Sequence, residues 1–207
     1  MTGSLASVTA FPAAKPELRS AALTRRAALG AKYRADASRR ATERLHPFVS
    51  RGGVVALFWP MRDEIDPRGL IARVLEAGGS IAMPVVERRR MFFRRFDGEA
   101  CLEPGVFGTS HPHSGQPAVD PDFIVAPLAA FDRRGGRIGY GAGHYDRAIA
   151  DLVARYRPVE LAGIAFAAQE VEEVPVEPHD VRLPLIATEH ELIEVHVPAA
   201  AGMEPTA

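Results

Sequence analysis

The sequence predicts an α/β protein, a three-layer sandwich in which helices cover both faces of a mostly parallel sheet. Apolar runs of strand length alternate with segments whose apolar residues recur at helical spacing. The runs are nearly continuous, which is typical of buried parallel strands, and none approaches the roughly 20 residues of a membrane span. We expect a single domain over residues 13–197, with flexible tails at 1–12 and 198–207.

The first expected elements are two helices and a strand. Residues 13–49 are rich in Ala, Arg and Leu, and Gly30 is the only glycine among them, so we expect one helix on either side of it. Residues 53–59 form a continuous apolar run of strand length. Asp66 and Pro67 then provide an N-cap and a first-turn proline for a third helix, whose expected inward residues are Leu70, Ile71, Val74 and Leu75.

The alternation continues to the end of the chain. Glycines at 78 and 79 end the third helix, and residues 101–121, with several Pro, Gly and His, are expected to be a loop. A fourth helix is predicted by apolar and aromatic residues at helical spacing, which are Tyr145, Ile149, Leu152, Val153 and Tyr156. The remaining strands are expected at 80–86, 91–96, 123–128, 161–167 and 192–197.

Composition and charge exclude several classes of function. The net charge of -1 provides no basic field for nucleic acid, so we expect no nucleic-acid partner. Cys101 is the only cysteine, which excludes a disulfide framework or a cysteine zinc site within the chain. The first 12 residues lack the basic start and apolar core of a signal peptide. We therefore expect a cytoplasmic monomer without a membrane partner.

A glycine-alternating segment lies between the strand expected at 123–128 and the fourth helix. Gly139, Gly141 and Gly143 occupy every second position, which lets the backbone approach a bulky anion, and the start of the next helix favours phosphate. The two common phosphate-binding motifs are absent, because neither lysine follows a glycine and His144 replaces the third glycine of the dinucleotide fingerprint. The spacing alone leaves a phosphate loop and a plain strand-to-helix turn equally open.

The longer pattern resembles a known family. Phe131-Asp132 together with residues 136–141 and 143–147 is similar to the signature of the 5-formyltetrahydrofolate cyclo-ligases, F-D-x-x-G-x-R-L-G-Y-G-G-G-Y-Y-D-R. Further stretches resemble the same family in the same order, namely residues 15–19, 61–65, 107–112, 177–180 and 187–189. The resemblance therefore covers nearly the whole chain.

The resemblance implies an activity. ATP would phosphorylate the formyl oxygen of 5-formyltetrahydrofolate in the presence of Mg²⁺, and N10 would then attack the activated carbon. The products would be 5,10-methenyltetrahydrofolate, ADP and phosphate. Such a reaction depends on charge neutralisation and on alignment of an oxygen with the γ-phosphorus.

The resemblance also implies which residues form the site. Arg137 and Tyr145 would be catalytic, Trp59 and Glu64 would contact the folate, and the Mg²⁺ ligands would be Asp146 and Asp180. The ATP contacts would be Lys15, Arg19, Arg137, Ile138, Gly139, Tyr140, Gly141, Ala142, Gly143, His144 and Tyr145.

The residue chemistry agrees with these roles without requiring them. Lys15 and Arg19 share one helix face, although charged helix faces usually just meet solvent. Two aspartates suit Mg²⁺, which takes one or two carboxylates plus phosphate oxygens and waters. The Glu64 carboxylate suits the donor edge of a pterin, whereas Trp59, at a strand end, is more often a core residue than a stacking partner.

Several positions depart from the family pattern and keep alternatives open. Ala142 replaces a glycine, which would cost about 1 kcal/mol if the position required a positive φ. His144 replaces a tyrosine, and further departures are His111, Pro184 and Leu128. A protein of the same fold that binds nucleotide or folate with weak catalysis therefore remains an alternative. A phosphosugar- or CoA-transferring α/β enzyme is another, and it predicts no paired aspartate site.

Overall fold

The computed structural model describes residues 14–155 and 158–195 of the 207-residue chain. The predicted tails at 1–12 and 198–207, and Tyr156 of the fourth helix, lie outside the described residues. The α-helices are α1 (Lys15–Ala27), α2 (Ala31–Val49), α3 (Gly69–Glu76) and α4 (His144–Ala154). The strands are β1 (Val54–Ala56), β2 (Ser80–Glu87), β3 (Arg90–Phe96), β4 (Leu102–Pro104), β5 (Ser110–Pro112), β6 (Phe123–Pro127), β7 (Ala130–Phe131), β8 (Arg137–Ile138), β9 (Glu160–Ile164), β10 (Leu185–Ala187) and β11 (Leu192–Glu194).

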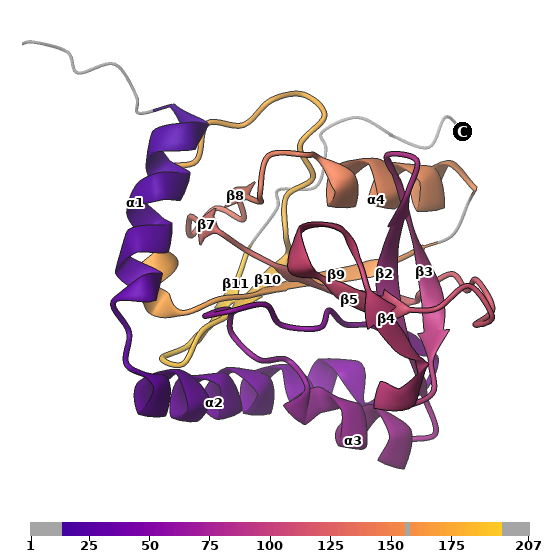
Figure 1. Ribbon diagram of the computed structural model, residues 1–207. Helices are drawn as coiled ribbons and strands as arrows, with labels where there is room; N and C mark the ends of the chain where they lie inside the picture. The colour runs from indigo at the N-terminus through magenta and orange to yellow at the C-terminus, as the bar shows by residue number, and fades with distance from the viewer. Residues whose placement is uncertain (1–13, 156–157, 196–207) are drawn as a thin grey trace, which may run out of the picture.

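A seven-stranded sheet forms the middle layer, with the strand order β11-β10-β9-β6-β1-β2-β3. The five inner strands are parallel to one another, and β11 and β3 pair antiparallel at the two edges. Helices α2 and α3 cover one face and α4 covers the other (Figure 1). The predicted three-layer α/β sandwich with a mostly parallel sheet is thus confirmed.

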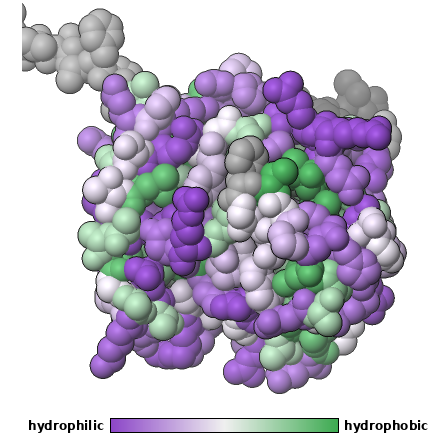
Figure 2. Space-filling view, viewed as in Figure 1, coloured by the Kyte–Doolittle hydropathy of each residue, from purple (hydrophilic) through white to green (hydrophobic). Residues whose placement is uncertain are grey.

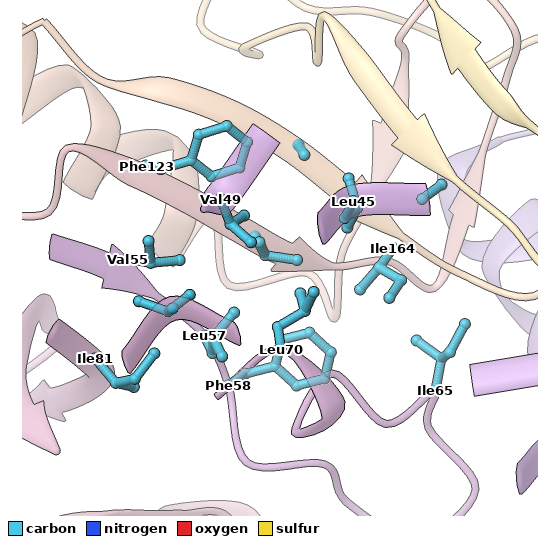
Figure 3. Close-up of a cluster of buried hydrophobic side chains, with 14 of the residues drawn as sticks. Leu45, Val49, Val55, Leu57, Phe58, Ile65, Leu70, Ile81, Phe123 and Ile164 are labelled. Carbon is cyan, nitrogen blue, oxygen red and sulfur yellow. The ribbon is translucent and has the colours of Figure 1, made fainter. Parts of the chain in front are cut away.

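The largest apolar cluster lies between the sheet and the helices α2 and α3 (Figure 3). Val55 and Leu57 belong to this cluster, whereas Ala56 between them belongs to the cluster on the α4 face. This alternation follows from the two-residue period of a strand. It explains why the central strands are apolar on both faces, as the continuous apolar runs predicted.

The third helix ends just before Gly78 and Gly79 as predicted, but it differs from the prediction at its start and in one inward residue. It begins at Gly69, because Asp66 accepts the backbone N–H of Arg68 over 2.9 Å in a turn that precedes the helix, and Arg68 itself is the N-cap. Leu70 and Val74 are buried as expected, but Leu75 is 53% exposed. Residues 70 and 74 lie one turn apart on the inner face, and position 75 already lies beyond its edge.

Short strands escaped the sequence prediction. The expected loop at 101–121 contains β4 and β5, which pair antiparallel, and β7 pairs with β8 just before the glycine segment. β10 and its pairing with β9 and β11 were also missed, and β1 is shorter than the predicted run at 53–59. Two or three residues are too few for a periodic signal, so neighbouring chain segments decide these pairings.

The surface seen in Figure 2 is mostly hydrophilic, with hydrophobic residues in separate patches. Among the helices of residues 14–155 and 158–195, none has the length and hydropathy to cross a membrane.

Candidate active site

One face of α1 supplies the first residues of the site. Lys15, Arg19, Ala22 and Arg26 follow each other at steps of four, three and four positions, which places them along one side of the helix. Ala22 is fully buried against Ala130 and other residues of a small apolar cluster, so this face docks on the β7–β8 ribbon. In Figure 1, α1 stands beside that ribbon.

Lys15 meets one of the predicted metal ligands. Its Nζ donates to Asp180 Oδ2 over 2.6 Å and lies 3.4 Å from Glu177 Oε1. Burial works against the charge on Lys15, but the hydrogen bond and the charge of Asp180 outweigh it and raise the lysine pKa. Burial likewise opposes the charge on Asp180, yet the hydrogen bond from Lys15 holds its pKa below the ordinary value.

The glycine segment forms an exposed loop between β8 and α4. Gly141 and Gly143 have φ values of +96° and +61°, which favour glycine, and Gly143 is the N-cap of α4. Ala142 does not have a positive φ, so the alanine in place of the family's glycine carries no backbone strain. Arg19 Nε donates to the Gly139 carbonyl over 2.7 Å and joins the loop to α1.

Ile138 contributes to this loop through its backbone. Its side chain is 2% exposed and packs in the small cluster beneath α1, whereas the predicted role was an ATP contact. A ligand above the loop can therefore reach only the main chain at this position. The buried side chain instead anchors the start of the loop.

Arg137 and Asp146 form a buried ion pair below the loop. Arg137 Nη2 lies 2.5 Å from Asp146 Oδ1, and the arginine side chain is 7% exposed. Arg137 also donates to the Val181 carbonyl, while Asp146 accepts the Val181 N–H over 3.2 Å. These bonds join the first turn of α4 to the segment that carries Asp180. Burial lowers the pKa of Arg137, and the charges of Asp146 and Asp180 both oppose that shift.

The two predicted metal ligands thus lie around one guanidinium. Asp146 accepts two hydrogen bonds through Oδ1, and Asp180 accepts Lys15 and the Glu177 N–H through Oδ2. Within residues 14–155 and 158–195, no group of three or more His, Cys, Asp or Glu side chains is placed to hold a metal ion. A pair of carboxylates fits a cation that completes its shell with phosphate oxygens and waters.

Glu64 lies at the opposite end of the site, in the segment that follows β1. It is 9% exposed, and it accepts the Met61 N–H on Oε2 over 2.9 Å and the Tyr140 hydroxyl on Oε1. Burial raises the pKa of Glu64 above its ordinary value of 4.5, against the opposing effect of the Tyr140 hydrogen bond. Tyr140 of the glycine loop and Glu64 are therefore in contact, although they lie 76 positions apart in the sequence.

Tyr145 and His144 occupy the first turn of α4. Burial raises the pKa of Tyr145, the nearby charge of Glu64 adds to this, and Arg137 opposes it. The hydroxyl therefore stays neutral near both residues. His144 Nδ1 lies 3.2 Å from Arg147 Nη2, and burial followed by the Arg147 charge lowers the histidine pKa. His144 is thus a neutral side chain beside the loop at neutral pH.

Trp59 is not brought into this cluster by any contact in the described residues. The Arg68 guanidinium lies over its ring, 4.7 Å from the centroid, and the Phe96 ring is 6.0 Å away at 43°. Trp59 also packs partly buried against the main apolar cluster. These contacts resemble those of a core-edge residue, which was the plainer of the two interpretations of its sequence position.

Arg26 and Asp63 are site residues that the sequence interpretation missed. Arg26 is 6% exposed and donates to both carboxylate oxygens of Asp63, over 2.9 and 3.2 Å. Its Nη1 also donates to the Tyr140 hydroxyl over 3.0 Å. The signal was present in the helical spacing, because Arg26 lies seven positions after Arg19 on the same face.

Comparison with known proteins identifies a family whose sequence pattern covers these site residues. A sequence profile of the 5-formyltetrahydrofolate cyclo-ligase family matches residues 12–189. The 5-formyltetrahydrofolate cyclo-ligase of Escherichia coli K12 is 29% identical over 173 residues, which cover 79% of this chain and 94% of the relative. The protein of that name from Mycolicibacterium smegmatis is 28% identical over 186 residues, which cover 86% and 94% of the two chains.

Solved structures with the same fold carry a related name. The NMR structure of Aquifex aeolicus 5,10-methenyltetrahydrofolate synthetase superposes with a TM-score of 0.71 at 28% identity, covering 92% of this chain and 97% of the other. A 5,10-methenyltetrahydrofolate synthetase from Mycoplasma pneumoniae gives a TM-score of 0.69 at 21% identity, covering 84% and 98%. The second likeness concerns the fold alone.

Proposed function

The chain belongs to the 5-formyltetrahydrofolate cyclo-ligase family and is a ligase of that family, and from this premise we propose that it converts 5-formyltetrahydrofolate and ATP to 5,10-methenyltetrahydrofolate, ADP and phosphate in the presence of Mg²⁺. The observation that supports this most is the 2.6 Å hydrogen bond between Lys15 and Asp180. It joins a cation proposed for the triphosphate to a carboxylate proposed for the metal, across 165 positions of sequence.

ATP is proposed to lie over the glycine loop. The main-chain N–H groups of residues 139–143 and the N-terminus of α4 would face its phosphate oxygens, where the helix dipole favours negative charge. Lys15 and Arg19 would add charge from α1. Both cations now rest on acceptors of the protein, so the triphosphate would exchange these contacts for stronger, charge-assisted ones.

Asp146 and Asp180 are proposed to hold Mg²⁺. Each uses one carboxylate oxygen for protein donors, and hard oxygen ligands of this kind suit the ion. The bound ion would neutralise charge on the β- and γ-phosphates. Arg137, ion-paired to Asp146, would keep that carboxylate oriented toward the phosphates.

Folate is proposed to bind at Glu64, which follows the central strand β1. Such folds bind ligands at the carboxyl ends of their parallel strands. The carboxylate would accept two hydrogen bonds from the donor edge of the pterin. Trp59 lies earlier in the same segment, between β1 and Glu64, and would border the substrate with an edge of its ring, since Arg68 covers one face.

The reaction then follows from alignment. The formyl oxygen attacks the γ-phosphorus, and ADP leaves. N10 attacks the formyl carbon, its proton is released, and phosphate departs with the former formyl oxygen. Arg137 would stabilise the phosphoryl charge, and the Tyr145 hydroxyl, kept neutral by burial, would donate a hydrogen bond without competing as a base.

The test uses the purified full chain with Mg-ATP and 5-formyltetrahydrofolate, and it follows both the absorbance of the methenyl product and the release of ADP. Formation of the two products in equal amounts supports the proposal. Binding of both ligands without turnover supports the alternative of a catalytically weak binding protein, which the departures at His111, His144 and Pro184 motivated. Failure to bind the folate contradicts both.

A further inference from the structure

A chain of hydrogen bonds links the glycine loop to the carboxylate proposed for folate. Arg26 Nη1 donates to the Tyr140 hydroxyl over 3.0 Å, and that hydroxyl donates to Glu64 Oε1. Tyr140 belongs to the loop between β8 and α4, whereas Glu64 follows β1. One side chain therefore joins the two halves of the site.

The Tyr140 side chain has its ring toward solvent and its hydroxyl toward the protein. The residue is 48% exposed as a whole, but burial of the hydroxyl and the Glu64 charge raise its pKa well above the ordinary value of 10.0. Its loop neighbours Gly139, Gly141 and Ala142 are all exposed. Three side-chain hydrogen bonds hold this part of the loop, namely those of the Tyr140 hydroxyl with Glu64, of Arg19 with the Gly139 carbonyl and of Arg147 with the Ala142 carbonyl.

Arg26 provides a rigid anchor for that hydroxyl. It is 6% exposed, and two of its nitrogens are held by Asp63, the residue next to Glu64. A planar guanidinium with three satisfied donors has little freedom to follow a moving loop. In the loop position seen here, the Tyr140 hydroxyl is held between this anchor and Glu64.

The hydrogen bond from Tyr140 orients Glu64 without blocking it. An ionised carboxylate has about four acceptor positions on its two oxygens. Tyr140 uses one on Oε1, and the Met61 N–H uses one on Oε2. About one position per oxygen remains, which is what two parallel donors of a pterin edge require.

We propose that Tyr140 and Arg26 are positioning residues that make nucleotide binding at the glycine loop and folate binding at Glu64 reinforce each other. This inference rests on the proposed function. A nucleotide that fixes the loop holds the Tyr140 hydroxyl on Glu64 and so fixes the carboxylate for the pterin. By linkage, folate raises the affinity for nucleotide by the same factor.

The test measures the dissociation constant of 5-formyltetrahydrofolate by calorimetry, with and without a non-hydrolysable ATP analogue and Mg²⁺. In the unmodified chain we expect the analogue to tighten folate binding about fivefold or more. In Tyr140→Phe, which removes only the hydroxyl, the dissociation constants of folate with and without the analogue should become equal. Arg26→Lys, which keeps the charge but not the three-way contact, should show the same loss.

Tyr33→Phe is a matched control. The Tyr33 hydroxyl also donates to a buried glutamate, Glu189, over 2.7 Å, but this pair lies outside the proposed site. The control should retain the full ratio of the folate dissociation constants measured without and with the analogue. A general loss of stability therefore cannot imitate the expected result. An unchanged ratio in Tyr140→Phe, or a ratio of one in the unmodified chain, overturns the inference and leaves the proposed function standing. Absence of folate binding in the unmodified chain overturns both.

Discussion

The two ends of the proposed site hold their carboxylates in opposite ways. Asp180 accepts a hydrogen bond from a charged partner, Lys15, and its pKa is lowered. Glu64 accepts its bonds from neutral groups, the Tyr140 hydroxyl and a main-chain N–H, and its pKa is raised. Burial favours the protonated form at both ends, and it is deeper at Glu64, which is 9% exposed, than at Asp180, whose side chain is 18% exposed, so the depth of burial and the partner together set the difference.

At Asp180 the charged donor outweighs desolvation, whereas at the more deeply buried Glu64 the neutral donors do not. This contrast suits the ligand proposed at each end. At the end with Lys15 and Arg137, the charged side chains are held in ion pairs. A triphosphate and a cation could replace these contacts with their own. The end with Glu64 keeps an ionisable acceptor whose desolvation is partly uncompensated, so donors from a ligand have more to gain there.

The largest effect should come from breaking the charged end at Asp146. Asp146→Asn is expected to lower kcat about 100-fold with the fold intact, because the proposed metal ligand loses its charge and Arg137 loses its ion-pair partner. The measurement is kcat as a function of Mg²⁺. Asp151→Asn on the same helix, where the exposed Asp151 pairs with Arg90, is the control and should leave kcat unchanged. A normal rate for Asp146→Asn at limiting Mg²⁺ would remove the metal role.

Lys15→Ala should have the next largest effect. We expect the KM for ATP to rise about tenfold or more, because the proposed charge-assisted phosphate contact is lost, while Asp180 keeps the Glu177 N–H as a donor. Initial rates at varied ATP give the value. Lys32→Ala removes the only other lysine of the chain, which is exposed on α2, and should change nothing. If both variants behave alike, α1 does not face the nucleotide.

Glu64→Gln tests the neutral end. We expect the KM for folate to rise about tenfold and the KM for ATP to rise less, because the amide offers one acceptor where the carboxylate offers two. Saturation curves for each substrate separate the two constants. Glu43→Gln, at an exposed ion pair on α2, is the control. Equal effects of Glu64→Gln on both substrates would count against its assignment to folate.

The smallest expected effect is on stability, and it has opposite sign at the two ends. The pKa of Glu64 is higher in the folded than in the unfolded chain, so its contribution to stability grows as pH falls through the window above 4.5. The pKa of Asp180 is lower in the folded chain, so its contribution is complete above 3.8 and is lost only as pH falls below that value. Urea titrations between about pH 7 and about pH 4 should distinguish them.

In these titrations, the free energy of unfolding of Glu64→Gln relative to the parent chain should fall by about 1 kcal/mol as pH is lowered, since the parent glutamate becomes neutral. The difference in the free energy of unfolding between Asp180→Asn and the parent chain should stay constant over the same pH range. The reverse pattern would contradict the comparison of the two ends.

The sequence was sufficient for the layers of the fold because they depend on long patterns. The run at 123–128 and the helical spacing from Tyr145 to Leu152 each specify an element and its buried face. β10 could not be found in this way, because three residues after Pro184 carry no period and pair only when β9 is already in place. The exposure of Leu75 was missed because four apolar residues in one helix suggested a wider inner face than the helix has.

The site was predictable where a family pattern fixed it and not where side chains meet in space. The pattern suggested Asp146, Asp180 and Glu64, and the structure places each beside the glycine loop or its flanking segments, while their metal and folate roles stay predictions. The family pattern did not indicate that the Tyr140 hydroxyl contacts Glu64. Arg26 was missed because one buried arginine cannot be recognised among many exposed ones without the packing of α1.

The ordinary backbone of Ala142 makes the loop open to chemical labelling. Ala142 is exposed, its φ is not positive, and the only native thiol of the chain, Cys101, is buried. A cysteine introduced at position 142 would therefore be the single accessible attachment point for a fluorophore, placed between two glycines that keep their native conformation. Such a conjugate would turn the arrival of a nucleotide at the loop into an optical signal that can be followed in real time.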